Sequence, residues 1–251
     1  CSWHMPQTRR NGFEEYKKQH IPNSIFFDLD ENSKKDTKLP HMLVQEEDWN
    51  NIVSKMGINN TDKIVIYDNS DVISSCRLWF NLIYFGHNAK LVHVLNGGFQ
   101  KWLSEKKGVT DQVSGTDNSN YKSLEKKELV KDKIMIDKNL DVQDFKLIDA
   151  RSKDRFYGKI PEPREGLRSG SIKNSFCIPF NTCLNEDRTF KKKSELEKIF
   201  KEYLEDLNEK NIVFSCGSGI TACVLALAYS LINDKYLPCI YDGSWAEYGI
   251  I

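Results

Sequence analysis

A single cysteine near the carboxyl end of the chain lies between two elements that suit nucleophilic chemistry. Cys216 follows the apolar run Asn211-Ile212-Val213-Phe214-Ser215, which is typical of a buried strand, and precedes an apolar run from Thr221 to Ile232, which is typical of a buried helix. Gly217 and Gly219 permit a tight turn in which backbone N–H groups and the helix N-terminus face the sulfur. These surroundings favour the thiolate, which is the nucleophilic form of cysteine. A buried structural cysteine is the alternative, and the order strand, cysteine, glycine turn, helix favours catalysis.

Strands and helices alternate along the whole chain, which is typical of parallel sheets covered by helices on both faces. The apolar patterns predict strands near residues 25–30, 63–68, 91–95, 145–150, 176–179, 211–215 and 237–242. They predict helices near residues 13–20, 45–56, 75–85, 99–106, 194–207 and 221–232. Ser194 and Glu197 fit a capping box at the start of the fifth of these helices.

The two halves of the chain repeat each other, so the fold is expected to be built twice. The run Lys63-Ile64-Val65-Ile66-Tyr67-Asp68 matches residues 211–216, and Leu95-Asn96-Gly97-Gly98-Phe99 matches Tyr241-Asp242-Gly243-Ser244-Trp245. Asp68 therefore takes the position of Cys216, and we expect the first half to keep the fold without the nucleophile. Asp149-Ala150-Arg151 is expected to match a segment that ends in Cys1-Ser2-Trp3, which places the opening strand of the first half upstream of Cys1.

Between the halves, the composition from Gly108 to about Lys138 changes to serine, asparagine, aspartate, glycine and lysine, as in a linker. We therefore predict an N-terminal domain at residues 1–108, a linker at 109–138 and a C-terminal catalytic domain at 139–251.

Composition excludes several classes of function. The 251 residues carry 36 basic and 36 acidic side chains, and this balance argues against nucleic acid or an anionic membrane surface as partner. No apolar run approaches the roughly 20 residues that span a bilayer. The 7 cysteines have neither CxxC pairs nor metal-ligand spacing, which argues against a metal site and for a reducing compartment. We expect the cytoplasm, or the mitochondrion if the source is eukaryotic.

Four motifs give the chain a resemblance to the tandem-domain rhodanese family, and within it to the 3-mercaptopyruvate sulfurtransferase type. They are Cys216-Gly217-Ser218-Gly219-Ile220-Thr221-Ala222, Glu162-Pro163-Arg164-Glu165-Gly166, Tyr241-Asp242-Gly243-Ser244-Trp245 and Pro40-His41-Met42-Leu43. The resemblance implies an α/β fold with two tandem rhodanese-like domains, each a mostly parallel five-stranded sheet with helices on both faces. It also implies an inactive first domain and an active second one that carries sulfur as a persulfide on Cys216, without a cofactor.

The resemblance further implies roles for individual residues. Gly217, Ser218, Gly219, Ile220 and Thr221 are expected to direct N–H groups at the thiolate and then at the persulfide. Arg155 and Arg164 match positions that clamp the carboxylate and carbonyl of the substrate. Ser218, His41 and Asp30 match positions of a proton-handling group, in which Asp30 fixes the tautomer of His41.

The donor is expected to be 3-mercaptopyruvate, with release of pyruvate and transfer of the sulfur to cyanide or to a thiol such as thioredoxin or a small thiol. Relatives that prefer thiosulfate carry basic residues just after the cysteine, whereas this chain has Gly217 and Ser218. Thiosulfate:cyanide sulfurtransferase is the first alternative. A non-catalytic rhodanese binding module is disfavoured by Cys216, and a Cys-based phosphatase is disfavoured because Cys-x5-Arg is required and Ala222 occupies the arginine position.

Overall fold

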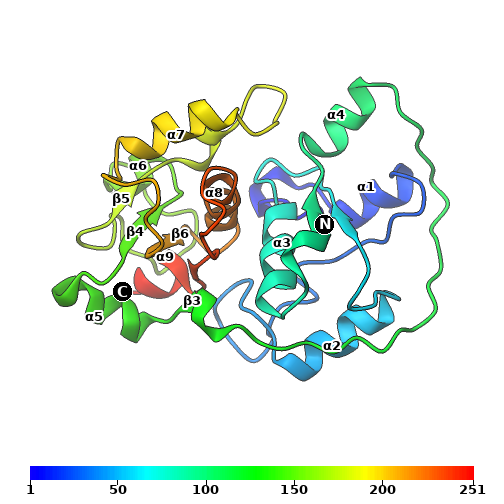
Figure 1. Cartoon of the computed structure of the whole chain (residues 1–251), viewed down its shortest axis with the longest axis horizontal. Helices are drawn as coiled ribbons and strands as arrows, with labels where there is room; N and C mark the ends of the chain where they lie inside the picture. The colour runs from blue at the N-terminus through cyan, green and yellow to red at the C-terminus, as the bar shows by residue number, and fades with distance from the viewer. The chain divides into compact units, whose positions relative to one another are not determined.

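The computed structural model describes residues 1–251, which form two compact units (Figure 1). Unit 1 comprises residues 1–36, 43–126 and 187–189, and unit 2 comprises residues 37–42, 127–186 and 190–251. Both units contain a parallel sheet and helices. The predicted α/β class, with the fold built twice, is therefore confirmed.

The sheet of unit 2 has five parallel strands in the order β3-β7-β6-β4-β5. Its central strands are β4 (Lys146–Asp149) and β6 (Ile212–Ser215), which pair along their full length from Lys146 with Ile212 to Asp149 with Ser215. The outer strands are β5 (Phe176–Cys177), β7 (Ile240–Tyr241) and β3 (Val130–Lys131). All four residues of β6 are buried, as expected for a strand that helices cover on both faces.

Neighbouring residues of β6 pack on opposite faces of this sheet. Val213 belongs to a core cluster with Ile136 and Trp245, whereas the ring of Phe214 meets those of Phe200 and Tyr229 at centroid distances of 6.2 and 6.3 Å. The first face is covered by α5 (Lys133–Val142) and α9 (Ser244–Tyr248), and the second by α7 (Lys193–Lys201) and α8 (Thr221–Ser230). The short helix α6 (Lys153–Phe156) follows β4, and the 3-10 turn η4 (Phe180–Cys183) follows β5.

The helix α8 is apolar on all sides, and most of its residues are buried, so it forms part of the core of unit 2 rather than its surface. The predicted capping box of α7 at Ser194 and Glu197 is wrong. The N-cap is Lys192, two residues before Ser194, and the side chain of Glu195 accepts a hydrogen bond from the backbone N–H of Lys192 at 3.2 Å. Glu195, rather than the predicted Glu197, is therefore the acceptor at the start of the helix.

Unit 1 contains two parallel strands, β1 (Ile64–Ile66) and β2 (Val92–Val94), which pair from Ile64 with Val92 to Ile66 with Val94. Its helices are α1 (Gly12–Lys18), α2 (Glu46–Lys55), α3 (Ser75–Tyr84) and α4 (Gly98–Ser104), with 3-10 turns η1 (Pro6–Thr8) and η2 (Ala89–Leu91). Every residue of α3 is buried. Trp49 of α2, which is fully buried, stacks on Phe85 with ring centroids 4.6 Å apart.

The sheet of unit 1 has two strands rather than the five expected. The predicted strand at residues 25–30 is not paired in a sheet, although Phe27 and Leu29 are buried at 2% exposure. Ile25–Phe27 and β1 both line a cavity of about 910 Å³. The two halves share one hydrogen bond at matching positions of the repeat. In the first half Cys1 N donates to Tyr67 O at 2.9 Å, and in the second half Ala150 N donates to Ser215 O at 2.8 Å. The strand expected upstream of Cys1 stays a prediction.

The predicted linker contains two structurally different parts. Residues up to Lys126 cluster with unit 1, where Thr110 pairs with His20 and Lys126 N donates to Tyr84 O at 2.8 Å. The 3-10 turn η3 (Lys127–Leu129), β3 and the start of α5 belong to unit 2. The domain boundaries at 108 and 139 stay predictions.

The core position of Phe214 yields a stability test. We expect Phe214→Ala to lower the free energy of unfolding by about 3–5 kcal/mol, because a fully buried aromatic ring is replaced by a cavity. Phe176→Ala, at a ring that is 39% exposed on the edge strand, is the matched control and should cost about 1 kcal/mol. Urea unfolding followed by circular dichroism measures both, and equal losses would contradict the packing described here.

Candidate active site

Cys216 lies directly after β6 and five residues before the start of α8. Gly219 adopts the left-handed conformation at φ 74°, which glycine adopts without steric cost. No side chain caps α8 at Ile220, and the first N–H groups of a helix have no intrahelical acceptor. The turn therefore joins strand and helix as the sequence predicts, with an N-terminus suited to an anion.

The first residues of α9 hold the backbone of Cys216 and Gly217 through three hydrogen bonds. Cys216 N donates to Ser244 Oγ at 3.1 Å, Trp245 N donates to Cys216 O at 3.0 Å, and Ala246 N donates to Gly217 O at 2.9 Å. Cys216 is 2% exposed, so these bonds lie away from competing water. The nucleophile candidate therefore has little freedom in its main chain.

Two guanidinium groups lie beside Gly217. A Cβ atom at this residue would lie 3.1 Å from Nη2 of Arg155 and 3.7 Å from Nη1 of Arg164. Glycine thus lets both charges approach the backbone next to Cys216, and a larger residue would displace them. The two arginines predicted to bind substrate are brought together here.

Arg155 is oriented by a buried carboxylate. Its Nε and Nη2 donate to the two oxygens of Glu162 at 3.1 and 2.6 Å, and the side chain of Glu162 is 1% exposed. Such a bidentate pair fixes the plane of the guanidinium as well as its position. The side chain of Arg155 remains 22% exposed, so it also faces solvent.

Arg151 belongs to the same ionic cluster, and its hydrogen bonds all go to neighbouring protein groups. It donates to both oxygens of Asp149, to Glu162 and to Gly170 O, and its guanidinium lies 4.4 Å from the ring centroid of Trp245. Burial alone would lower the pKa of Arg151, but the carboxylates of Asp149 and Glu162 outweigh it and raise that pKa. Arg151, which the sequence analysis left outside the site, is committed to neighbouring protein groups.

Ser218 lies between a histidine and an arginine of the predicted site. Its Oγ is 3.0 Å from Nδ1 of His41 and accepts a hydrogen bond from Nη2 of Arg164 at 3.3 Å. Ser218 and His41 are each 6% exposed. His41 has φ 61°, a left-handed conformation that is uncommon for a non-glycine residue. Residues 37–42 belong to unit 2, so these three side chains form one cluster within that unit.

Asp30 belongs to unit 1, where both of its carboxylate oxygens accept from the indole Nε1 of Trp3, at 3.0 and 3.1 Å. Its predicted role in fixing the tautomer of His41 stays a prediction.

The first half of the chain holds a carboxylate where the second half holds the thiol. Asp68 Oδ2 accepts from the backbone N of Ser70 and of Ser74, at 3.0 and 3.2 Å, and from the hydroxyl of Ser70. Its other oxygen, Oδ1, accepts from the hydroxyl of Ser75 at 2.7 Å. The loop and helix start that follow β1 therefore surround a fixed anion.

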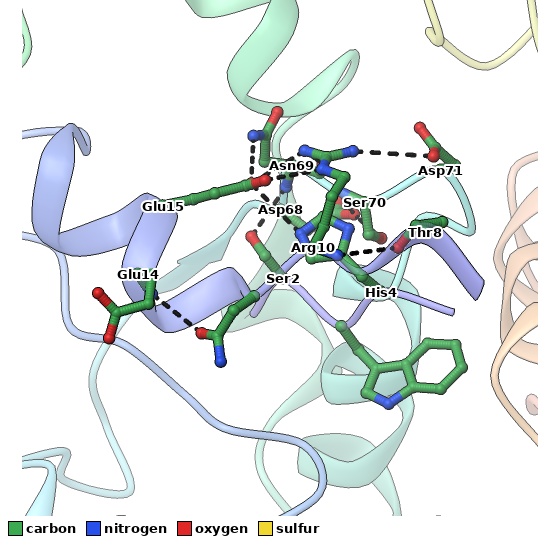
Figure 2. A network of polar contacts seen from close by, with 12 residues as sticks. Ser2, His4, Thr8, Arg10, Glu14, Glu15, Asp68, Asn69, Ser70 and Asp71 are labelled. Carbon is green, nitrogen blue, oxygen red and sulfur yellow. Dashed lines mark hydrogen bonds and ion pairs between the residues drawn. The ribbon is translucent and has the colours of Figure 1, made fainter. Parts of the chain in front are cut away.

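An arginine paired with glutamate accompanies this carboxylate, as in the second half. Figure 2 shows Arg10 with Glu15 beside Asp68 and Asn69. Arg10 Nε and Nη2 donate to Glu15 at 2.7 and 2.9 Å, and Nη2 also donates to Asn69 O at 2.9 Å. Asn69 takes the position of Gly217 in the internal repeat, so both halves place an arginine–glutamate pair next to this residue.

Two contributors to the site were not selected from the sequence. Glu162 stands in the motif Glu162-Pro163-Arg164-Glu165-Gly166. An acidic residue close in sequence to Arg155 and Arg164 was the available signal. Ser244 stands opposite Gly98 in the internal repeat, and this difference between otherwise matching turns was the only indication of it.

The chain contains no group of three or more histidine, cysteine, aspartate and glutamate side chains that could hold a metal ion. None of its helices combines the length and apolar character that crossing a bilayer requires.

Comparison with known proteins points to one family. The profile of the rhodanese-like domain matches residues 9–105 and 132–250. The chain is 38% identical to "Thiosulfate/3-mercaptopyruvate sulfurtransferase 1, mitochondrial" of Arabidopsis thaliana, over 99% of this chain and 70% of that protein. It is 34% identical to "3-mercaptopyruvate sulfurtransferase" of Mus musculus, over 99% of this chain and 83% of that protein. Among solved structures, the Tum1 protein from Saccharomyces cerevisiae matches with a TM-score of 0.88 and 28% identity, over 99% of this chain and 86% of that chain.

Three other cysteines are expected to be weak nucleophiles in the folded protein. Burial raises the pKa of Cys177, Cys183 and Cys239 to about 12, so these thiols stay protonated, and weakly nucleophilic, in the folded protein until the pH approaches 12. We expect iodoacetamide at neutral pH to modify Cys216 and to leave these three unmodified, as measured by peptide mass mapping after brief treatment. Equal labelling of Cys183, which is fully buried, would contradict this expectation.

Proposed function

Because the chain belongs to the rhodanese family, with two rhodanese-like domains in tandem, we propose that it transfers a sulfane sulfur from 3-mercaptopyruvate to a thiol or cyanide acceptor. The intermediate is a persulfide on Cys216. One observation carries the proposal: this cysteine lies between a strand end and an uncapped helix N-terminus, and the guanidinium groups of Arg155 and Arg164 converge on the adjacent Gly217.

The first half-reaction is a displacement at sulfur. The Cys216 thiolate attacks the sulfur of mercaptopyruvate, an S–S bond forms, and the C–S bond breaks with its electron pair moving onto the three-carbon fragment as the enolate of pyruvate. In the second half-reaction an acceptor thiolate or cyanide attacks the outer sulfur, and the S–S electron pair returns to Cys216. The N–H groups at Gly217, Ser218, Gly219, Ile220 and Thr221 are proposed to stabilise the sulfur anion in both states.

The substrate carboxylate and carbonyl are proposed to bind Arg155 and Arg164. A guanidinium presents paired N–H donors that match a carboxylate. Glu162 holds Arg155 through two hydrogen bonds, which leaves its remaining N–H groups to face a ligand. Two fixed cations beside Gly217 also stabilise the negative charge that develops on the enolate oxygen.

Ser218 and His41 are proposed to protonate the enolate carbon. Ser218 Oγ lies 3.0 Å from Nδ1 of His41, within the range for proton transfer. The hydroxyl proton passes to the carbon, and His41 replaces it. Asp30 remains the candidate for orienting His41.

The choice of donor follows from the turn after the cysteine. Thiosulfate is a dianion that basic residues after the cysteine would favour, whereas Gly217 and Ser218 carry no charge. Thiosulfate:cyanide transfer is the second candidate, and the two guanidinium groups beside Gly217 favour it as a secondary activity.

Acceptor, cofactor and compartment complete the proposal. Rhodanese sulfurtransferases use a cysteine persulfide, and we propose that no further cofactor takes part. Thioredoxin or a small thiol is the proposed acceptor. A reducing compartment, the cytoplasm or the mitochondrion, keeps the 7 cysteines reduced.

The donor assignment is tested by comparing two steady-state assays on the intact chain. We expect pyruvate release from mercaptopyruvate to have the larger kcat/KM, and thiocyanate formation from thiosulfate with cyanide to be slower. Cys216→Ser should abolish both. A larger kcat/KM with thiosulfate would instead establish the second candidate.

The carboxylate clamp is tested at Arg164. Arg164→Ala should lower kcat/KM for mercaptopyruvate by about 10- to 100-fold, which corresponds to the loss of a charge-assisted hydrogen bond of about 1.5–3 kcal/mol. Arg9→Ala, at an exposed arginine of unit 1, is the matched control and should behave as wild type. Unchanged kinetics for Arg164→Ala would remove this residue from the site.

A further inference from the structure

The hydroxyl of Ser244 binds the backbone of the proposed nucleophile. Ser244 is fully buried, its Oγ donates to Tyr241 O at 2.8 Å, and the same oxygen accepts from Cys216 N at 3.1 Å. A serine hydroxyl has one proton, and here that proton goes to Tyr241. Toward Cys216 the hydroxyl is therefore an acceptor only, held in one orientation.

Ser244 has a backbone conformation that does not suit serine. Its φ is 49°, in the left-handed region where a Cβ atom crowds the backbone and where glycine is preferred. The strain is present in a residue that contacts the nucleophile directly, and strained residues persist only when the surrounding structure fixes them.

The first half of the chain supplies an internal comparison. Gly98 stands at the position of Ser244, with φ 57°, and Phe99 N donates to Asp68 O at 3.0 Å. The second half has the same bond, from Trp245 N to Cys216 O at 3.0 Å. The turn therefore forms without a side chain at this position. What serine adds is the hydroxyl, and it is present in the half that carries the thiol.

We propose that Ser244 is a positioning residue for Cys216. By accepting the N–H of Cys216 it fixes the main chain from which the sulfur projects, so that the sulfur faces the N-terminus of α8. Without this acceptor the buried N–H has no partner of its own, and the turn must shift to satisfy it. The inference rests on the proposed function only for its catalytic consequence, since the position of the thiol can be measured without any sulfur donor.

The main test is Ser244→Gly, because glycine adopts the left-handed conformation and the first half already uses it. We expect this variant to fold, because relief of the backbone strain at φ 49° offsets part of the cost of the lost hydrogen bond. Iodoacetamide should modify Cys216 about tenfold more slowly at neutral pH, and kcat for mercaptopyruvate should fall by a similar factor with KM unchanged. Wild-type alkylation in a folded Ser244→Gly protein would overturn the proposal.

Two further variants separate positioning from stability. Ser244→Ala lacks the hydroxyl and keeps the strain, so it should have a lower Tm than the glycine variant and the same slow alkylation. Ser244→Thr keeps the hydroxyl, and its folded fraction should be alkylated at the wild-type rate although the β-branched side chain lowers Tm. A purely structural role predicts that alkylation follows Tm across the three variants, and that result would also overturn the proposal.

If wild-type protein turned over neither donor while the alkylation pattern held, the proposed function would fail and the positioning role would stand.

Discussion

The active half depends on how firmly one short turn is held at the carboxyl end of a buried strand. Three hydrogen bonds from the start of α9 hold Cys216 and Gly217, and the parallel pairing of β6 with β4 and β7 fixes the strand before them. Ligands of parallel sheets bind at the carboxyl ends of the strands, where loops and helix N-termini meet. A cysteine at this position lies next to the backbone N–H groups of the turn and of the start of α8, and the sheet fixes where these groups lie.

The charged side chains around that turn form buried ion pairs rather than exposed salt bridges. The carboxylates of Asp149 and Glu162 and the guanidinium of Arg151 are almost fully buried, where each ion requires partners because desolvation is costly. Their pairing leaves Arg155 and Arg164 as the guanidinium groups beside Gly217. The first half builds a similar arrangement around Asp68, with its own carboxylate as the anion. At this position the first half has a carboxylate and the second half has a cysteine.

The alternation of strands and helices and the place of Cys216 could be predicted because they follow from local apolar patterns, as in Ile212–Ser215 and the mostly apolar α8. Residues 25–30 were predicted as a strand because of their apolar pattern, but a strand also needs a neighbour at hydrogen-bonding distance, which no local pattern specifies. The short strand β3 was missed because its two residues, Val130 and Lys131, carry no periodicity. Glu162 contacts Arg151 and Arg155 across a loop without periodicity, and Ser244 contacts Cys216 from 28 residues away. No local apolar pattern specifies either contact, so only the folded chain reveals them.

The central claim is that a sulfur atom rests on Cys216 between donor and acceptor. Its most direct test is mass spectrometry of protein treated with mercaptopyruvate, quenched, and digested without reductant. We predict that the peptide containing Cys216 gains the mass of one sulfur atom, that the gain disappears on addition of a thiol acceptor, and that peptides containing Cys177 and Cys183 are unchanged. No added sulfur on the Cys216 peptide, while pyruvate is still released, would contradict the account.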